Sequence, residues 1–126
     1  MNPSIIAVVA IGGAIGSVFR YLVSTIQNPM VAFPYAIFLV NLSGAFLMGV
    51  VVALLGLKFA VSSEVRAFLT TGILGGYTTF STFSLESAML IERHDYATAA
   101  AYILGSVVLC ISALFCGMWL VRAVYA

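Results

Sequence analysis

The segment that most constrains this chain is a run of glycine and hydroxyl residues inside an apolar stretch. Residues 72–86 read GILGGYTTFSTFSLE, where a membrane-spanning helix would be expected to stay uniformly apolar. Glycine weakens a helix, and backbone groups that are released in lipid need other partners. Non-helical backbone at membrane depth is tolerated only where it is buried in protein or lines a wet cavity. The segment therefore predicts a site within the membrane, and its hydroxyl groups favour an ion as the ligand.

The composition places the whole chain in the membrane. Its 126 residues are 63% hydrophobic and 7% charged, whereas soluble domains carry about 25% charged residues. The length allows one domain, residues 1–126, and the net charge of +1 gives no reason to expect nucleic acid binding. The N-terminus lacks the basic region of a cleaved signal, so we expect it to remain as a helix.

Four apolar stretches are each long enough to cross a bilayer, which requires about 20 residues. They cover about residues 4–26, 35–57, 65–91 and 97–124. The third is interrupted near Gly75 and Gly76, and Ser62 or Ser63 is the expected N-cap before it. The predicted fold is an all-α membrane protein with four transmembrane helices, of which the third is broken. An even number of crossings puts both termini on one side.

The basic residues are almost evenly divided between the two sides of the membrane. Lys58, Arg66 and Arg122 fall on the side of the termini, and Arg20 and Arg93 fall on the other. The positive-inside rule requires a clear excess on one side, so three against two gives little preference, although five charges could also balance by chance. The division predicts a dual-topology protein, which could assemble as an antiparallel homodimer.

Small residues spaced four apart predict close contacts between helices. The pairs are Gly12 with Gly16, Gly13 with Ser17, and Ala45 with Gly49. Packing is the favoured interpretation, because the GGAIG sequence follows no strand and lacks the acidic residue of a dinucleotide site.

Three side chains near the interruption could meet an anion. Asn41 lies about two turns into the second span, where an asparagine more often joins helices than binds a ligand. Its side-chain NH₂ is nevertheless a neutral double donor. Phe80 and Phe83 share one helix face. Such a pair is usually core or lipid-facing, but the positive ring edges could also face an anion.

A mildly polar stripe is expected on the fourth helix. Tyr102, Ser106 and Cys110 are spaced four apart. The stripe could provide polar groups along an ion path, or it could be a packing seam in which the Ser106 hydroxyl bonds back to its own helix.

Three further polar side chains have open roles. Thr82 and Glu86 lie four apart on the third span, and an acid within the membrane is a functional candidate by default. Glu86 could instead sit near the interface. Arg20 lies near the end of the first span and could extend its charged group to the surface.

The interruption itself could hold a cation. Carbonyl groups released around Gly75 and Thr78 could bind a bare ion, as unwound backbone does in transporters. In an antiparallel dimer, two such interruptions could meet and form a symmetric cage of oxygen atoms.

Taken with these features, three motifs resemble the Fluc (CrcB-type) family of fluoride channels. They are GGAIGSVFRY early in the chain, NLSGAFLMG in the second span and GGYTTFSTFSLE in the third. The last is highly specific, and the resemblance covers the whole chain. It implies a dual-topology antiparallel homodimer with two fluoride pores and one central sodium ion. It also implies passive export of fluoride across the cell membrane, the inner membrane in a bacterium.

The resemblance assigns roles to individual residues by position. Asn41, Phe80 and Phe83 match the family's pore residues, and the carbonyls of Gly75 and Thr78 match its sodium ligands. The remaining matches are Tyr102 and Ser106 on a polar track, Thr82 and Glu86 at positions linked to it, and Arg20 at the vestibule. Cys110 departs from the pattern, since a further hydroxyl is expected there.

Two other classes of protein are alternatives to a fluoride channel. A small multidrug-type, proton-coupled transporter also has four helices and dual topology, but that family needs a glutamate in its first span, and this first span has no acid. A structural subunit without transport of its own would show no fluoride efflux. An enzyme is not expected, because the sequence offers no nucleophile–base pair or metal-ligand set.

Overall fold

The computed structural model describes residues 1–57 and 60–125, and these residues form helices without any β-strand. Three of the helices are long and apolar enough to cross a membrane: α1 (Pro3–Ser24), α2 (Tyr35–Leu57) and α6 (Tyr96–Tyr125). The prediction of an all-α, multi-pass membrane protein is confirmed. Lys58, which entered the count of basic residues, lies outside the described residues.

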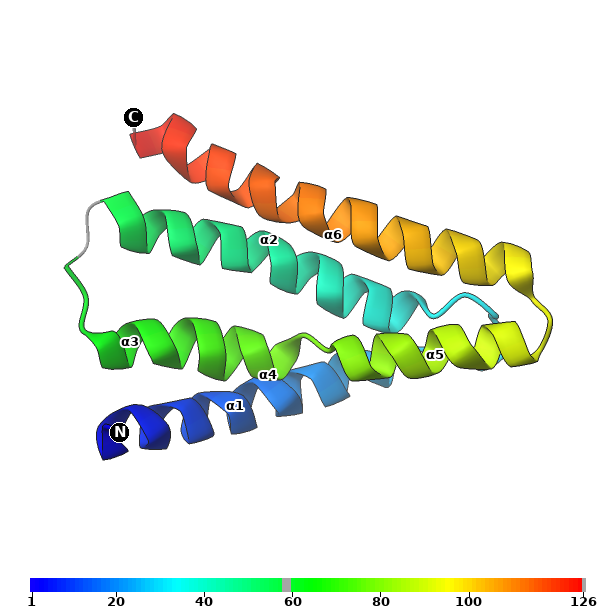
Figure 1. Cartoon of the computed structure of the whole chain (residues 1–126), viewed down its shortest axis with the longest axis horizontal. Coiled ribbons are helices and arrows are strands. Elements are labelled where there is room, and N and C mark those ends of the chain that lie inside the picture. The colour runs from blue at the N-terminus through cyan, green and yellow to red at the C-terminus, as the bar shows by residue number, and fades with distance from the viewer. Residues whose placement is uncertain (58–59, 126) are drawn as a thin grey trace.

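The third predicted span consists of several shorter helical pieces. They are α3 (Ser63–Ala67), the π-helix η1 (Phe68–Leu74), α4 (Gly75–Tyr77) and α5 (Phe80–Glu92). Ser62 caps α3, since its side chain accepts a hydrogen bond from the amide of Val65. Figure 1 shows these pieces following one another along one line, with a short non-helical connection between α4 and α5.

The glycines do not form the non-helical connection, contrary to the expected position of the interruption. Gly75 is helical, with φ −65° and ψ −36°, and no described glycine has a positive φ. The extended residues are Thr78, with ψ 158°, and Thr79, with φ −153° and ψ 120°. Gly76 serves close packing instead, because a Cβ atom there would lie 2.6 Å from the carbonyl oxygen of Gly13.

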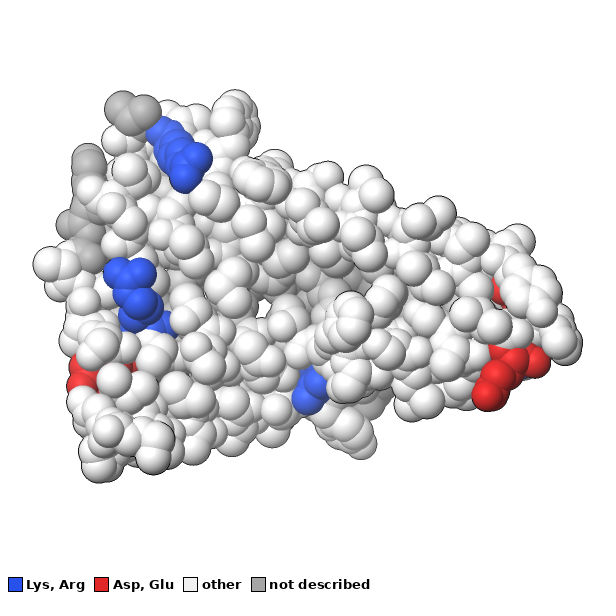
Figure 2. Space-filling view, in the orientation of Figure 1, with Lys and Arg blue, Asp and Glu red and all other residues white. Residues whose placement is uncertain are grey.

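The helices are arranged as two adjacent pairs. α2 packs mainly against α6, and α1 packs mainly against η1 and α4. Both termini lie at the same end of the molecule (Figure 1). Figure 2 shows the charged side chains gathered at the two ends of this face, apart from one basic side chain nearer the middle. The long middle, with this single charged side chain on the face shown, is the part that fits the bilayer.

Glycines allow the helix backbones within each pair to approach closely. Added Cβ atoms at Gly16 and Gly49 would overlap the carbonyl oxygens of Ile73 and Leu114, respectively. The predicted packing role of these positions is confirmed. Gly13 differs, because no atom outside its own helix lies within 4 Å of a Cβ built there.

The α2–α6 contact should be sensitive to one added methyl group on α6. A Cβ atom at Gly117 would overlap the carbonyl oxygen of Phe46, and overpacking of this kind costs about 1–3 kcal/mol. We therefore expect Gly117→Ala to lower the unfolding temperature of the purified protein in detergent. Gly105→Ala is the matched control on the same helix, since a Cβ there meets nothing within 4 Å. Equal stability of the two variants would contradict this account of the contact.

Candidate functional site

The extended residue Thr79 is held by the side chain of Asn41 on α2. The Thr79 amide donates to Asn41 Oδ1 at 2.8 Å, and Asn41 Nδ2 donates to the Thr79 carbonyl at 3.0 Å. One side-chain amide thus satisfies both main-chain groups of Thr79, which is a buried residue. Such groups would otherwise be costly to leave unpaired.

The same connection removes the helical partners of two carbonyl groups. In an α-helix each carbonyl accepts from the amide four residues later. The amide that would reach the Gly75 carbonyl belongs to Thr79, and it donates to Asn41 instead. The amide that would reach the Thr78 carbonyl belongs to Thr82, and it donates to Thr79 Oγ1 at 3.2 Å. Both predicted cation ligands therefore lack their usual helical hydrogen bond.

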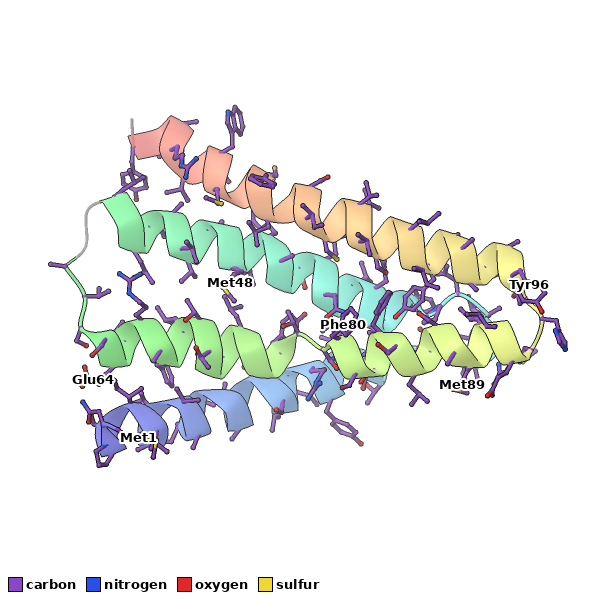
Figure 3. The ribbon with its side chains drawn as sticks, viewed as in Figure 1. Met1, Met48, Glu64, Phe80, Met89 and Tyr96 are labelled. Atoms are coloured by element: carbon purple, nitrogen blue, oxygen red, sulfur yellow. The ribbon has the colours of Figure 1, made fainter. Side chains whose placement is uncertain are left out.

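A groove of about 410 Å³ lies beside this connection, between α2, the start of α5 and α6. Figure 3 shows Phe80 at the start of α5 and Met48 on α2, both of which line the groove. The predicted site residues that line it are Asn41, Thr78, Phe80, Phe83, Ser106 and Cys110. The fold thus brings residues from three separate spans to one place.

A continuous row of aromatic rings begins at the groove with Phe80 and Phe83 and continues beyond its lining. The ring centroids of Phe80 and Phe83 are 5.4 Å apart, and those of Phe83 and Tyr102 are 5.2 Å apart. The row continues to Phe33, 5.5 Å from Tyr102. Phe83 is 8% exposed and Phe80 is 77% exposed, so the row runs from the interior of the chain to its surface.

Ser106 presents a buried hydroxyl group that has no partner. Its side chain is 6% exposed, and within the described part of the chain its Oγ is the buried side-chain oxygen without a hydrogen bond. The back-bonded packing role considered for this residue is therefore not observed, although Ser112 on the same helix does donate to the carbonyl of Val108. An unpartnered hydroxyl that lines a groove is suited to a ligand that accepts hydrogen bonds.

Tyr102 and Glu86 form a direct pair outside the groove lining. Tyr102 is completely buried, and its hydroxyl donates to Glu86 Oε2 at 2.6 Å. The pair joins α6 to α5 and fixes the position of the Tyr102 ring behind Phe83. The sequence did not indicate a hydrogen-bond partner for Glu86, and the structure shows that this partner is Tyr102.

Removal of the Tyr102 hydroxyl should destabilise the protein. Tyr102→Phe would leave the half-buried Glu86 carboxyl without its donor, and losing one partner of such a bond costs about 1–3 kcal/mol. We expect a lower unfolding temperature in detergent for Tyr102→Phe, and restoration of much of the loss when Glu86→Leu is added. A Tyr102→Phe variant as stable as the parent would contradict a stabilising role for this bond.

Arg20 and Thr82, like Gly75, Glu86 and Tyr102, do not line the groove. Arg20 is half-buried near the C-terminal end of α1, and Thr82 bonds back to the cap of its own helix, where its Oγ1 accepts from Thr79 Oγ1 at 3.2 Å. No direct contact links Thr82 to Glu86 among the hydrogen bonds of the described residues. The groove thus brings together only part of the predicted set.

Sequence reasoning missed Thr79 and Phe33 as parts of the site. Thr79 caps α5 through its side chain and meets Asn41 through its main chain. A threonine immediately before a helical run is a recognisable N-cap signal, so its capping role could have been inferred. Phe33 lies in the connection between α1 and α2, and nothing in the sequence indicates that it reaches Tyr102.

The described residues contain no conventional cluster of metal-binding side chains. No group of three His, Cys, Asp or Glu side chains lies close enough to hold a metal in the portion that the structure describes. The sequence predicts a cation at the main-chain carbonyls of Gly75 and Thr78, whose usual helical donors bond elsewhere. The available anion contacts are the Ser106 hydroxyl, the second hydrogen of Asn41 Nδ2 and the edges of the phenylalanine rings.

Known proteins match almost the entire chain. Residues 7–118 match a family described as CrcB-like protein, Camphor Resistance (CrcB). The chain is 48% identical over 118 residues to a fluoride-specific ion channel FluC of Rhodopseudomonas palustris (strain BisB5), covering 92% of this chain and 95% of the relative. It is 48% identical over 122 residues to the fluoride-specific ion channel FluC of Agrobacterium fabrum, with 95% and 98% of the two chains covered. A protein of the same name from Nitrobacter winogradskyi is 44% identical over 126 residues, with 98% and 100% covered.

Proposed function

Because this chain belongs to the CrcB-like protein family, we propose that it is a fluoride-specific ion channel that lets fluoride leave the cytoplasm passively. Its relatives over the full length carry that function in their names. The chain is a membrane channel and not an enzyme. The alternative of a proton-coupled multidrug transporter is not favoured, since the sequence of α1 contains no acidic residue.

The observation that carries the proposal is the groove that combines Asn41, Phe80, Phe83 and Ser106. It offers neutral donors and ring edges, with the unpartnered Ser106 hydroxyl among them. Neutral donors suit a small anion that has to move on, because a fixed positive charge in the path would hold it. In this proposal the Tyr102–Glu86 pair supports the aromatic row, Thr82 shapes the start of α5, and Arg20 attracts anions at the vestibule.

The cost of desolvation limits how such a path can work. Moving a small ion into a low-dielectric interior costs on the order of 20 kcal/mol in the ideal limit. A hydrogen bond to a charged group returns about 1.5–3 kcal/mol. The few donors of the groove cannot offset that cost at one point. The path therefore requires wet vestibules, donors in succession and a nearby positive charge.

We propose further that the working unit is an antiparallel homodimer with two pores. Phe80 is 77% exposed in the single chain although it lines the groove, so a second copy would be needed to enclose it. The near balance of basic residues supports insertion in both orientations. In this arrangement α3, η1, α4 and α5 together form one broken transmembrane helix.

A sodium ion on the dimer axis would supply the positive charge. The carbonyls of Gly75 and Thr78 fit this role, because the amides of Thr79 and Thr82 bond elsewhere. Two copies would contribute four neutral oxygens. Such a set suits a small monovalent cation, since divalent sites usually recruit Asp or Glu. The ion would be held structurally and would not be transported.

The function is tested with purified protein in liposomes. Liposomes loaded with fluoride or with chloride are diluted into a solution free of that ion, and the released anion is followed with an ion-selective electrode. We expect rapid fluoride release and little chloride release without any proton gradient. Equal release of both anions, or release that depends on a proton gradient, would contradict a fluoride-specific channel.

A further inference from the structure

We propose that Asn41 is a positioning residue that creates the cation ligand at Gly75 by holding Thr79 extended. The inference rests on the proposed channel function and its sodium site. It assigns Asn41 a second task besides contact with the anion. A single side chain then couples the anion path to the cation site.

The two hydrogen bonds of Asn41 select one backbone conformation. In an extended residue the amide and the carbonyl point to the same side, as in a hydrogen-bonded pair of antiparallel strands. In a helix they point in opposite directions along the axis. Asn41 Oδ1 and Nδ2 reach the two groups of Thr79 at 2.8 and 3.0 Å, respectively. This double contact is available only to an extended Thr79, which has φ −153° and ψ 120°.

The N-cap role of Thr79 and its contact with Asn41 both oppose a continuous helix here, and Asn41 is the group that takes the Thr79 amide. Residues up to Tyr77 and from Phe80 onward are helical, and the intervening sequence contains no proline. Without Asn41, the Thr79 amide would have the Gly75 carbonyl as its nearest helical partner. A hydrogen bond from the Thr79 amide to the Gly75 carbonyl would compete with the cation for that oxygen. Asn41 therefore leaves the Gly75 carbonyl without this hydrogen bond, because Asn41 Oδ1 accepts from the Thr79 amide that would otherwise donate to it.

The test uses sodium-dependent stability, which a pure anion donor would not affect. The unfolding temperature of purified protein in detergent is measured in sodium chloride and in N-methyl-D-glucamine chloride. We expect sodium to raise the unfolding temperature of the parent protein and to have little effect on Asn41→Leu. Ser43→Ala is the control on the same helix, because the Ser43 hydroxyl bonds the Leu39 carbonyl and Tyr77 rather than Thr79.

A second variant interrupts the helix without any side-chain amide at position 41. Ser81 is the second residue of α5, so its amide has no partner within that helix to lose, whereas proline within a continuous helix costs about 3 kcal/mol. Asn41→Leu combined with Ser81→Pro should therefore regain the sodium response, and Ser81→Pro alone should keep it. The Ser81 hydroxyl lies 3.2 Å from Thr79 Oγ1, so Ser81→Ala serves as the control for the loss of that contact. A regained sodium response would separate the effect of Asn41 on the backbone from its role as a donor to the anion. The reason is that the double variant still lacks the side-chain amide at position 41.

Each outcome decides the proposal. A sodium response that persists in Asn41→Leu would overturn it, and so would a double variant that does not fold or does not respond to sodium. An absent response in the parent protein would overturn both this inference and the sodium site. Fluoride flux in liposomes would still report separately on the channel function.

Discussion

Two lysines added to the connection between α2 and α3 should abolish fluoride flux when that variant is expressed alone. Ala60→Lys with Val61→Lys would change the division of basic residues from three against two to five against two. The positive-inside rule then favours one orientation for every copy. Parallel insertion would leave the proposed antiparallel dimer without its partner. Flux is measured as fluoride release from membranes or liposomes containing the variant.

A partner with the opposite bias should restore the flux. Met30→Lys and Val31→Lys, combined with Arg122→Gln, would place two basic residues on the side of the termini and four on the other. Met30 is 91% exposed, so lysine there meets no packed neighbour. We expect each biased variant to be inactive alone and active when the two are expressed together. Full activity of either variant alone would rule out the antiparallel arrangement.

Replacement of either phenylalanine of the groove should reduce fluoride flux strongly. Phe80→Ile and Phe83→Ile remove the positive ring edge and keep apolar bulk. A loss of about 1.4 kcal/mol in stabilisation at the barrier lowers the rate about tenfold, and we expect a decrease of at least that size. Efflux from liposomes measures the rate, and size-exclusion chromatography verifies that each variant remains assembled.

Two further variants serve as comparisons for the flux of the groove phenylalanine variants. Phe115→Ile is the matched control, because Phe115 is exposed on α6 and does not line the groove; its flux should stay close to that of the parent. Asn41→Asp replaces a neutral donor with an anionic acceptor, so it should also be nearly inactive. If both groove phenylalanine variants assembled correctly and kept normal flux, the proposed role of the ring edges would be wrong.

The sequence determined the membrane class, the helix bounds and the close helix contacts of this protein. Local patterns carry these properties: an apolar stretch of about 20 residues is enough to predict a crossing helix. α1, α2 and α6 begin and end within two residues of the predicted spans. The glycines at positions 12, 16 and 49 mark contacts because the absence of a side chain is itself local information.

Several residues that line the groove were singled out from the sequence, but their grouping was not available from it. Asn41, Phe83 and Ser106 lie on three different helices, and only their packing places them around one groove. The interruption was expected near Gly75 and Gly76, but the extended residues are Thr78 and Thr79, and the main chain of Thr79 bonds Asn41 on α2. Gly76 instead allows the close approach of Gly13.

Hydrogen bonds between distant residues were decided by the tertiary structure alone. Asn41 meets Thr79 across 38 positions of sequence, and Tyr102 meets Glu86 across 16. A side-chain amide or hydroxyl has no periodicity that identifies its partner; the partner is whichever unpaired group the packed helices bring within reach. The apolar pattern therefore determined where the chain crosses the membrane, and the packing of α2 against the α4–α5 connection decided which carbonyl groups remain open.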